Sequence, residues 1–203
     1  MKDLRKYYIL SETILFLIFI FLDLRHQDSS LFKYSGIVLC LIHTLFVRNI
    51  EGSLAFCLTL AADWFLLIQN THYPAGVLFF LLVQAVYAHI LVQKGCRLLL
   101  PLRTFLLALS QIVLVLLKRC DLLNSMVLFY FTLLVGNLFS SFTNKKLRIM
   151  SGGFLLFVCC DICVGLFNLL DPGTARNVAA ILMWIFYLPS QVLLALGQDT
   201  DQD

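Results

Sequence analysis

Two aspartates stand out because each is the only charged residue in an apolar segment that could cross a membrane. Asp63 lies in LTLAADWFLLIQ, residues 58–69, and Asp161 lies in FLLFVCCDICVGLFN, residues 154–168. An aspartate at the centre of a spanning helix costs about 2.5–3.5 kcal/mol, so it is a functional candidate by default. Two adjacent carboxyl groups can act as an acid and a carboxylate in one reaction. We therefore expect the fold to bring Asp63 and Asp161 together.

The composition is that of a protein embedded in a membrane. Of the 203 residues, 61% are hydrophobic and only 13% are charged, whereas soluble domains are about 25% charged. A net charge of +3 without a large basic cluster gives no support for nucleic acid binding. We interpret Lys145, Lys146 and Arg148 as a topology signal. Cys160 and Cys163 form a CxxC pair, but no second pair completes a zinc site, so we expect no metal.

Apolar runs separated by short polar loops predict an all-α, polytopic membrane helix bundle of about eight transmembrane helices. The chain then forms a single integral membrane domain over residues 1–203. The predicted spans are residues 7–24, 33–47, 52–69, 75–92, 98–117, 122–142, 149–169 and 176–196. Most basic residues, Arg103 among them, fall on the same side of the membrane as the amino terminus. The positive-inside rule therefore predicts that both termini are cytoplasmic, in a multi-pass protein of the cell (plasma) membrane.

The two acids are expected at the same depth in spans that run in the same direction. Each lies twelve residues beyond the start of its span, counted from Glu51 and Ile149, which places it about 18 Å from the cytoplasmic end. Each acid-bearing span is followed by a span that contains a tyrosine. This spacing suggests two parallel four-helix repeats.

Polar residues on two of these spans could line a cavity together with the acids. Gln84 and Tyr87 are three residues apart, and Tyr187 and Gln191 are four apart, so each pair shares one face of its helix. Pro189 lies between the second pair and should kink that helix. Hydrogen bonding between helices is the alternative role of these side chains, and the sequence leaves it open.

Two stretches resemble the signatures of the YhhN-like lysoplasmalogenase family of integral membrane proteins. The first is AADWFLLIQNTHYPAGVLFFLLVQAVY, residues 61–87. The second is GGFLLFVCCDICVGLFNLL, residues 152–170, followed by FYLPSQVLLALG with Tyr187 and Gln191. Lys33 also matches a lysine that is common in this family.

The chain departs from the family pattern at three positions. Ala62 stands where the family usually has glycine, and Cys160 stands where it usually has serine. Gln84 stands where it usually has histidine. A glutamine can hydrogen-bond but does not carry a proton at neutral pH, so an acid or base role of that histidine is missing here.

The resemblance implies hydrolysis of the vinyl ether bond of a lysoplasmalogen to a fatty aldehyde and glycerophosphoethanolamine or glycerophosphocholine. This reaction begins with protonation of carbon and passes through an oxocarbenium ion, which a carboxylic acid beside a carboxylate would promote. We hypothesise that Asp63 and Asp161 form this catalytic pair, and which of them is the acid stays open. The side chains expected to bind substrate are Lys33 at the phosphate and Gln84, Tyr87, Tyr187 and Gln191 at water and glycerol. No cofactor is required.

Two other functions remain open from the sequence. A membrane carrier would also keep acids at membrane depth. A non-catalytic relative that binds lysolipids would explain the missing histidine. The expected partners are a lysophospholipid substrate and membrane lipids, with no nucleic acid, and the sequence identifies no protein partner.

Overall fold

The computed structural model describes residues 2–25, 27–116 and 118–198. Its helices are α1 (Lys2–Leu24), α2 (Ser30–Phe46), α3 (Ile50–Asp63), α4 (Tyr73–Gln93), α5 (Leu100–Leu116), α6 (Leu122–Ser141), α7 (Arg148–Leu169) and α8 (Thr174–Leu196). A π-helix, η1 (Trp64–Ile68), continues α3, and a 3-10 turn, η2 (Lys145–Leu147), precedes α7. The described residues contain no strand. The predicted all-α fold with about eight helices is therefore confirmed.

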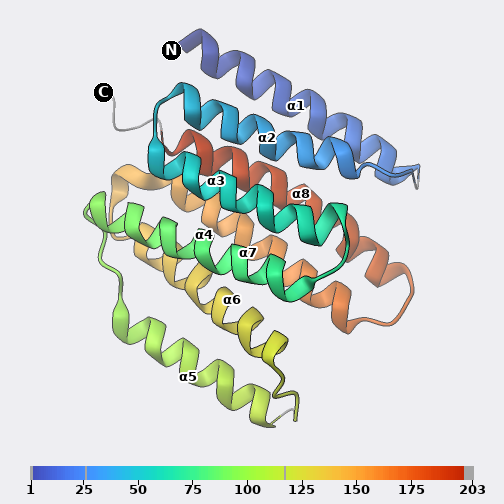
Figure 1. Cartoon of the computed structure of the whole chain (residues 1–203), viewed down its shortest axis with the longest axis vertical. Coiled ribbons are helices and arrows are strands. Elements are labelled where there is room, and N and C mark those ends of the chain that lie inside the picture. Colours follow the sequence, from blue (N-terminus) through green and yellow to red (C-terminus); the bar gives the residue numbers. More distant parts are fainter. Residues whose placement is uncertain (1, 26, 117, 199–203) are drawn as a thin grey trace.

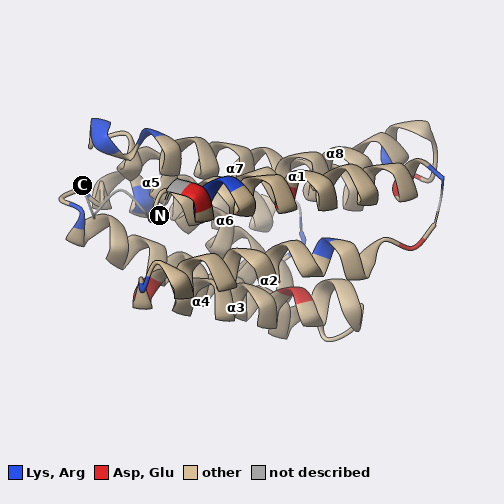
Figure 2. Ribbon diagram, turned by 90° about the horizontal axis from the view of Figure 1, so that it is seen from above, with Lys and Arg blue, Asp and Glu red and all other residues tan. Residues whose placement is uncertain are grey.

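The helices have the character of membrane spans. Within the described ranges, six are long and apolar enough to cross a bilayer, whereas α2 and α5 are apolar but shorter, at 17 residues each. Figure 2 shows charged residues mainly toward the helix ends, with long uncharged stretches between them. Large apolar side chains such as Leu17, Phe21 and Phe105 point outward, which suits a surface in contact with lipid tails.

Six of these helices form a closed ring around the interior. α2 packs on α3, α3 on α4, α4 on α6, α6 on α7, α7 on α8, and α8 returns to α2. α1 packs outside the ring against α2 and α8, and α5 packs against α6. Figure 1 shows α1 and α5 at opposite edges, with the start of α1 and the end of α8 at the same end of the bundle.

The order of packing repeats between the two halves of the chain. When α1, α2, α3 and α4 are matched to α5, α6, α7 and α8 in order, each contact in the first half has a counterpart in the second. The contacts α1–α2, α2–α3, α3–α4 and α4–α6 then correspond to α5–α6, α6–α7, α7–α8 and α8–α2. Exchanging α1–α4 for α5–α8 keeps this order of packing, as two parallel four-helix repeats require. This order places α3 and α7, the helices that carry the two acids, across the ring from one another.

Close helix contacts depend on a few small or capping residues. At Gly153, an added Cβ would lie 2.8 Å from Leu194 Cγ, so α7 and α8 approach one another closely there. Asn49 caps α3 by accepting a hydrogen bond from the Gly52 amide at 2.7 Å. These features fix how α3, α7 and α8 enter the ring.

Candidate functional site

Asp63 is the last residue of α3, and its side chain is 5% exposed. The Tyr187 hydroxyl on α8 donates a hydrogen bond to Asp63 Oδ2 at 2.7 Å. Directly after Asp63 the chain becomes the π-helix, in which the Gln69 amide donates to the Trp64 carbonyl at 2.9 Å. Short π-helical segments are often found at functional sites because they change the direction of side chains within a helix.

Asp161 belongs to the same polar cluster as Asp63, although it lies on α7. Its Oδ2 atom is buried and has no hydrogen-bond partner among the described residues. Tyr130 on α6 forms a hydrogen bond with the Asp161 carboxyl and also lies near that of Asp63. Cys160, the neighbour of Asp161, likewise lies near both carboxyl groups. Tyr187 in turn interacts with Tyr130 and Cys160. The two acids therefore border one buried cluster, which we call the acid cluster: Asp63, Asp161, Tyr130, Cys160 and Tyr187.

Aromatic rings surround this cluster. The Phe157 ring centre lies 6.5 Å from that of Tyr130 and 5.7 Å from that of Tyr187. Phe80 packs against Tyr130 and Phe157 at 5.7 Å and 5.9 Å. Ring faces of this kind exclude water and attract a cation. The surroundings therefore suit a reaction in which positive charge develops on an apolar substrate.

Gln84 and Tyr87 are fully buried on α4. Gln84 Oε1 accepts a hydrogen bond from Asn137 Nδ2 at 2.9 Å, and Asn137 Oδ1 accepts one from the Arg103 guanidinium at 2.8 Å. Gln84 Nε2 and the Tyr87 hydroxyl have no partner in the described part of the chain. The Tyr87 ring packs edge-on against Phe154 at 5.4 Å.

Gln191 is fully buried on α8, where its Nε2 donates to Ser190 Oγ at 3.4 Å. Its Oε1 atom has no partner within the described ranges. Asp161, Gln84, Tyr87 and Gln191 thus each carry a buried polar atom without a protein hydrogen bond. Such an atom costs about 1–3 kcal/mol, and in native proteins it commonly marks a functional group or a water position.

Lys33 lies outside the acid cluster, in the first turn of α2. Its Nζ atom forms an ion pair with Asp23 Oδ2 at 2.9 Å and lies 4.6 Å from the centre of the Trp184 ring. The Trp184 ring is 5.4 Å from the Tyr187 ring. Lys33 is therefore connected to Asp63 through two aromatic side chains of α8.

Sequence reasoning missed several of these residues. Tyr130 and Trp184 stand among many apolar and aromatic residues, although Trp184 shares a helix face with Tyr187 through their three-residue spacing. Arg103 was interpreted only as a topology signal. The structure shows its side chain 8% exposed and bonded to Leu98, Asn137 and Ser140. That network is visible only once α5 is placed beside α6.

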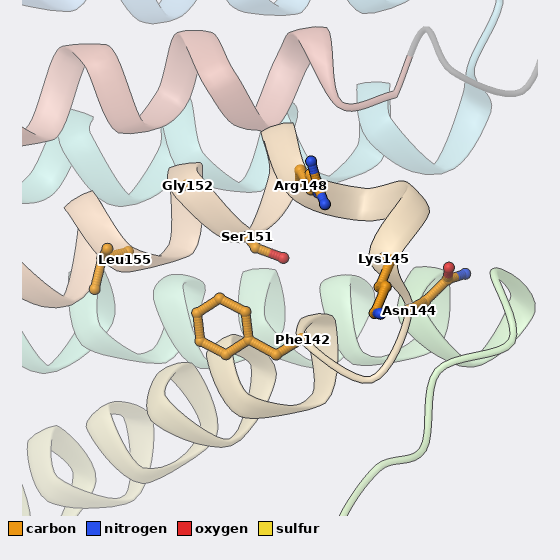
Figure 3. Close-up of a pocket in the computed structure, with 7 residues that line it drawn as sticks. All are labelled: Phe142, Asn144, Lys145, Arg148, Ser151, Gly152 and Leu155. Atoms are coloured by element: carbon orange, nitrogen blue, oxygen red, sulfur yellow. The ribbon is translucent and has the colours of Figure 1, made fainter.

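Two further features lie outside the acid cluster. Glu12 on α1 is buried, and Cys40 Sγ donates to its Oε1 at 3.6 Å. A cavity of about 400 Å³ lies at one end of α6 and α7, and Figure 3 shows the residues around it. Its lining is Phe142, Asn144, Lys145, Arg148, Ser151, Gly152 and Leu155. It lies more than one helical turn from Asp161 along α7, so it is separate from the acids.

The chain matches a known protein family over most of its length. A model described as the YhhN family matches residues 14–198, which include both acids and all the other predicted site residues. The chain belongs to the YhhN family. The resemblance found in the sequence motifs is thereby confirmed. No curated protein and no solved structure matches this YhhN chain.

The three departures of this YhhN chain from the family pattern have definite positions in the fold. Ala62 is fully buried beside Asp63, and Cys160 contributes a thiol where a family serine would place a hydroxyl beside both acids. Gln84 is two hydrogen bonds from the Arg103 guanidinium. A neutral amide suits this position because it adds no second positive charge to the buried network.

Proposed function

We propose that the protein is a lysoplasmalogenase, which hydrolyses the vinyl ether bond of a lysoplasmalogen inside the membrane. The observation that carries the proposal is the acid cluster, where two membrane carboxyls lie near the same tyrosine and cysteine side chains. Membership of the YhhN family supports it. The products would be a fatty aldehyde and glycerophosphoethanolamine or glycerophosphocholine.

The two acids take different roles in the proposed mechanism. Tyr187 donates to Asp63 Oδ2, and a donated hydrogen bond is strongest when the acceptor is charged. Tyr130 also forms a hydrogen bond with the Asp161 carboxyl, but the Oδ2 atom of Asp161 has no partner among the described residues. We therefore assign the proton donor to Asp161, whose Oδ2 is open to the substrate, and the carboxylate to Asp63.

The reaction proceeds by proton transfer and addition of water. Asp161 gives its proton to the alkene carbon remote from the ether oxygen, and the π electrons form the new C–H bond. The oxocarbenium ion that results is stabilised by the Asp63 carboxylate, in the way that glycosidases use paired carboxyl groups. Water adds to the cationic carbon and gives up a proton to restore Asp161. The hemiacetal then releases the glycerol oxygen as an alcohol, and the aldehyde forms.

The remaining site residues would position these reactants. Gln84, Tyr87 and Gln191 each have a buried polar atom available to water or to the glycerol hydroxyl. Tyr187 holds the Asp63 carboxylate in place. Lys33 would meet the phosphate at the headgroup end.

We also propose that the protein spans the plasma membrane with both termini in the cytoplasm. The start of α1 and the end of α8 lie at the same end of the bundle (Figure 1), and the loops at that end carry most of the basic residues. In this orientation both acids lie in the outer half of the bilayer. The lysolipid would enter from the outer leaflet.

A carrier is the second candidate, favoured by the two-fold packing of the helices around acids at membrane depth. It would move a lysolipid or another solute without forming aldehyde. A lysolipid-binding relative without activity is the third candidate, favoured by glutamine at position 84. Both alternatives retain the acid cluster, but neither includes hydrolysis of the vinyl ether.

The deciding experiment is aldehyde release from lysoplasmenylcholine and lysoplasmenylethanolamine by the purified protein in detergent. Asp63→Asn and Asp161→Asn should each reduce the rate by about 10²-fold or more, as expected for removal of a general acid or its charged partner. Asp171→Asn is the matched control, because Asp171 is exposed in the turn between α7 and α8. Its rate should equal that of the wild type.

Other outcomes select among the candidates. If the wild type and a Gln84→His variant both release no aldehyde, the enzyme proposal is wrong. Flux of lysolipid into proteoliposomes would then support the carrier. Binding without flux would support the non-catalytic relative.

A further inference from the structure

The ammonium group of Lys33 occupies a site built from three other side chains. Asp23 Oδ2 lies 2.9 Å from Nζ, the Trp184 ring centre lies 4.6 Å away and the Phe19 ring centre lies 5.7 Å away. Phe19 and Asp23 come from α1 and Trp184 comes from α8. We call Phe19, Asp23 and Trp184 the ammonium site. Lys33 enters it from α2 and is only 9% exposed there.

A lysine near the end of a membrane helix normally extends its ammonium toward water. Lys33 instead places its charge between a carboxylate and two aromatic rings. Such a buried pair is weak evidence for stability, because the loss of hydration offsets much of the attraction. A carboxylate beside aromatic faces is, however, the chemistry by which proteins recognise alkylammonium groups.

The ammonium site is close to the acid cluster. The Trp184 ring lies 5.4 Å from the Tyr187 ring, and the Tyr187 hydroxyl bonds to Asp63. Asp23 lies in the last turn of α1 and Lys33 in the first turn of α2, so the site lies toward one end of the bundle. A lipid headgroup held at this end would direct its chain inward, toward the acids.

We propose that Phe19, Asp23 and Trp184 bind the ammonium group of a zwitterionic lysophospholipid, in the place that the Lys33 ammonium occupies in this structure. The inference rests on the proposed function for the identity of the lipid and goes beyond it in assigning the headgroup site. On binding, the lipid ammonium replaces Nζ between Asp23 and Trp184. Lys33, released from Asp23, turns to the phosphate of the same headgroup.

This exchange gives both Lys33 and Asp23 a role in binding the headgroup. The ion pair of Lys33 with Asp23 carries no net charge, and neither does a zwitterionic headgroup. The exchange therefore replaces one buried ion pair by two without leaving an unpaired charge in the membrane. A lysophospholipid without an ammonium group would leave Asp23 without a cationic partner and bonded only to the Ser29 hydroxyl among the described residues, so it should bind more weakly.

The test measures binding of saturated ether analogues, which have no vinyl ether to hydrolyse. The two probes are 1-O-alkyl-lysophosphatidylcholine and 1-O-alkyl-lysophosphatidic acid of equal chain length. The chain has two tryptophans, so a Trp64→Phe background leaves Trp184 as the only one and makes its fluorescence a reporter of the site. In this background the choline lipid should bind about 10-fold more tightly than the phosphate lipid.

Asp23→Asn should lower affinity for the choline lipid by about 10-fold and leave or raise affinity for the phosphate lipid, because Lys33 is then free to pair with phosphate. Asp28→Asn is the matched control, since Asp28 is an exposed acid in the loop that follows α1 and is bonded to the Ser30 amide. Because Asp28 lies near Lys33 and does not pair with the ammonium group, this change should leave the preference for choline intact. Asp23→Glu should retain the preference for choline. Thermal melting confirms that each variant is folded.

The proposal is overturned if Asp23→Asn and Asp28→Asn shift both lipids equally, or if the folded Asp23→Asn variant keeps its preference for choline. Failure of the proposed function looks different. If the choline analogue binds in a way that depends on Asp23 but the vinyl ether lipid releases no aldehyde, the ammonium site is supported and the proposed enzymatic function is contradicted. If aldehyde is released but Asp23→Asn has no effect on headgroup preference, the enzymatic function is supported and the ammonium site is contradicted.

Discussion

The Tyr187 hydroxyl lies 2.7 Å from Asp63 Oδ2, and this hydrogen bond joins the last helix of the ring to the third helix of the chain. Both residues are buried. Since neither side chain is in contact with bulk water, the bond determines the orientation of the carboxylate.

Tyr187→Phe removes the hydroxyl and keeps the ring against Trp184 and Phe157. We expect kcat for aldehyde release to fall by about 10- to 100-fold, because a preorganised donor to a reacting carboxylate is lost, while KM changes little. Tyr73→Phe is the control, since the Tyr73 side chain is 47% exposed and its hydroxyl bonds only to Asn70 in the described structure. Equal rates for the two variants would contradict the role given to Tyr187.

The buried network of Arg103 should contribute to stability more than to catalysis. Arg103→Leu leaves the Asn137 Oδ1 and Leu98 carbonyl acceptors without this donor, and we expect a loss of about 2–4 kcal/mol in the free energy of unfolding. Chemical denaturation in detergent measures the loss. Arg97→Leu removes an exposed positive charge near the same end and should cost less than about 0.5 kcal/mol. Similar losses in the two variants would contradict the importance of the network.

The contact between α7 and α8 can be tested with two glycines of the same helix. Gly153→Ala places a methyl group 2.8 Å from Leu194 Cγ and 3.0 Å from the Leu194 amide nitrogen, so we expect a loss of about 1–3 kcal/mol through overpacking. Gly165→Ala meets no atom within 4 Å and should stabilise α7 by about 0.5–1 kcal/mol. The melting temperatures should therefore move in opposite directions. A fall at both positions would show that close packing is not the cause.

The orientation in the membrane predicts which cysteine reacts in intact cells. Cys120 is exposed between α5 and α6, on the outer side if both termini are cytoplasmic. A membrane-impermeant maleimide should label the wild type before permeabilisation and fail to label Cys120→Ser. A cysteine introduced at Lys145, at the opposite end of α6, should react only after permeabilisation. The reverse pattern would place the termini outside.

The number of helices could be predicted from the sequence because apolar runs and polar turns alternate clearly. The span predicted over residues 52–69 corresponds to α3 and η1 together. The π-helical turn within it could not be foreseen, because Trp64–Ile68 is as apolar as an ordinary membrane helix. The two acids were identified by their isolation in apolar sequence, a local property.

The environment of the acids was less predictable, because it depends on which helices become neighbours. Tyr130 reaches Asp161 only through the packing of α6 on α7. Lys33 was expected at a phosphate, and its pairing with Asp23 follows from the turn between α1 and α2. Pairings of this kind depend on tertiary geometry that no spacing rule gives.

The closure of the ring by α8 also affects how the protein is made. Asp63 and Tyr187 are separated by 124 residues, so at ordinary rates of translation about 6–25 s pass between their syntheses. Throughout that interval the growing chain holds an aspartate for which its hydroxyl donor does not yet exist. Insertion of α8 is therefore the step that supplies Asp63 with its hydroxyl donor. A chain released before α8 would leave Asp63 without Tyr187, a defect by which membrane proteases could recognise it.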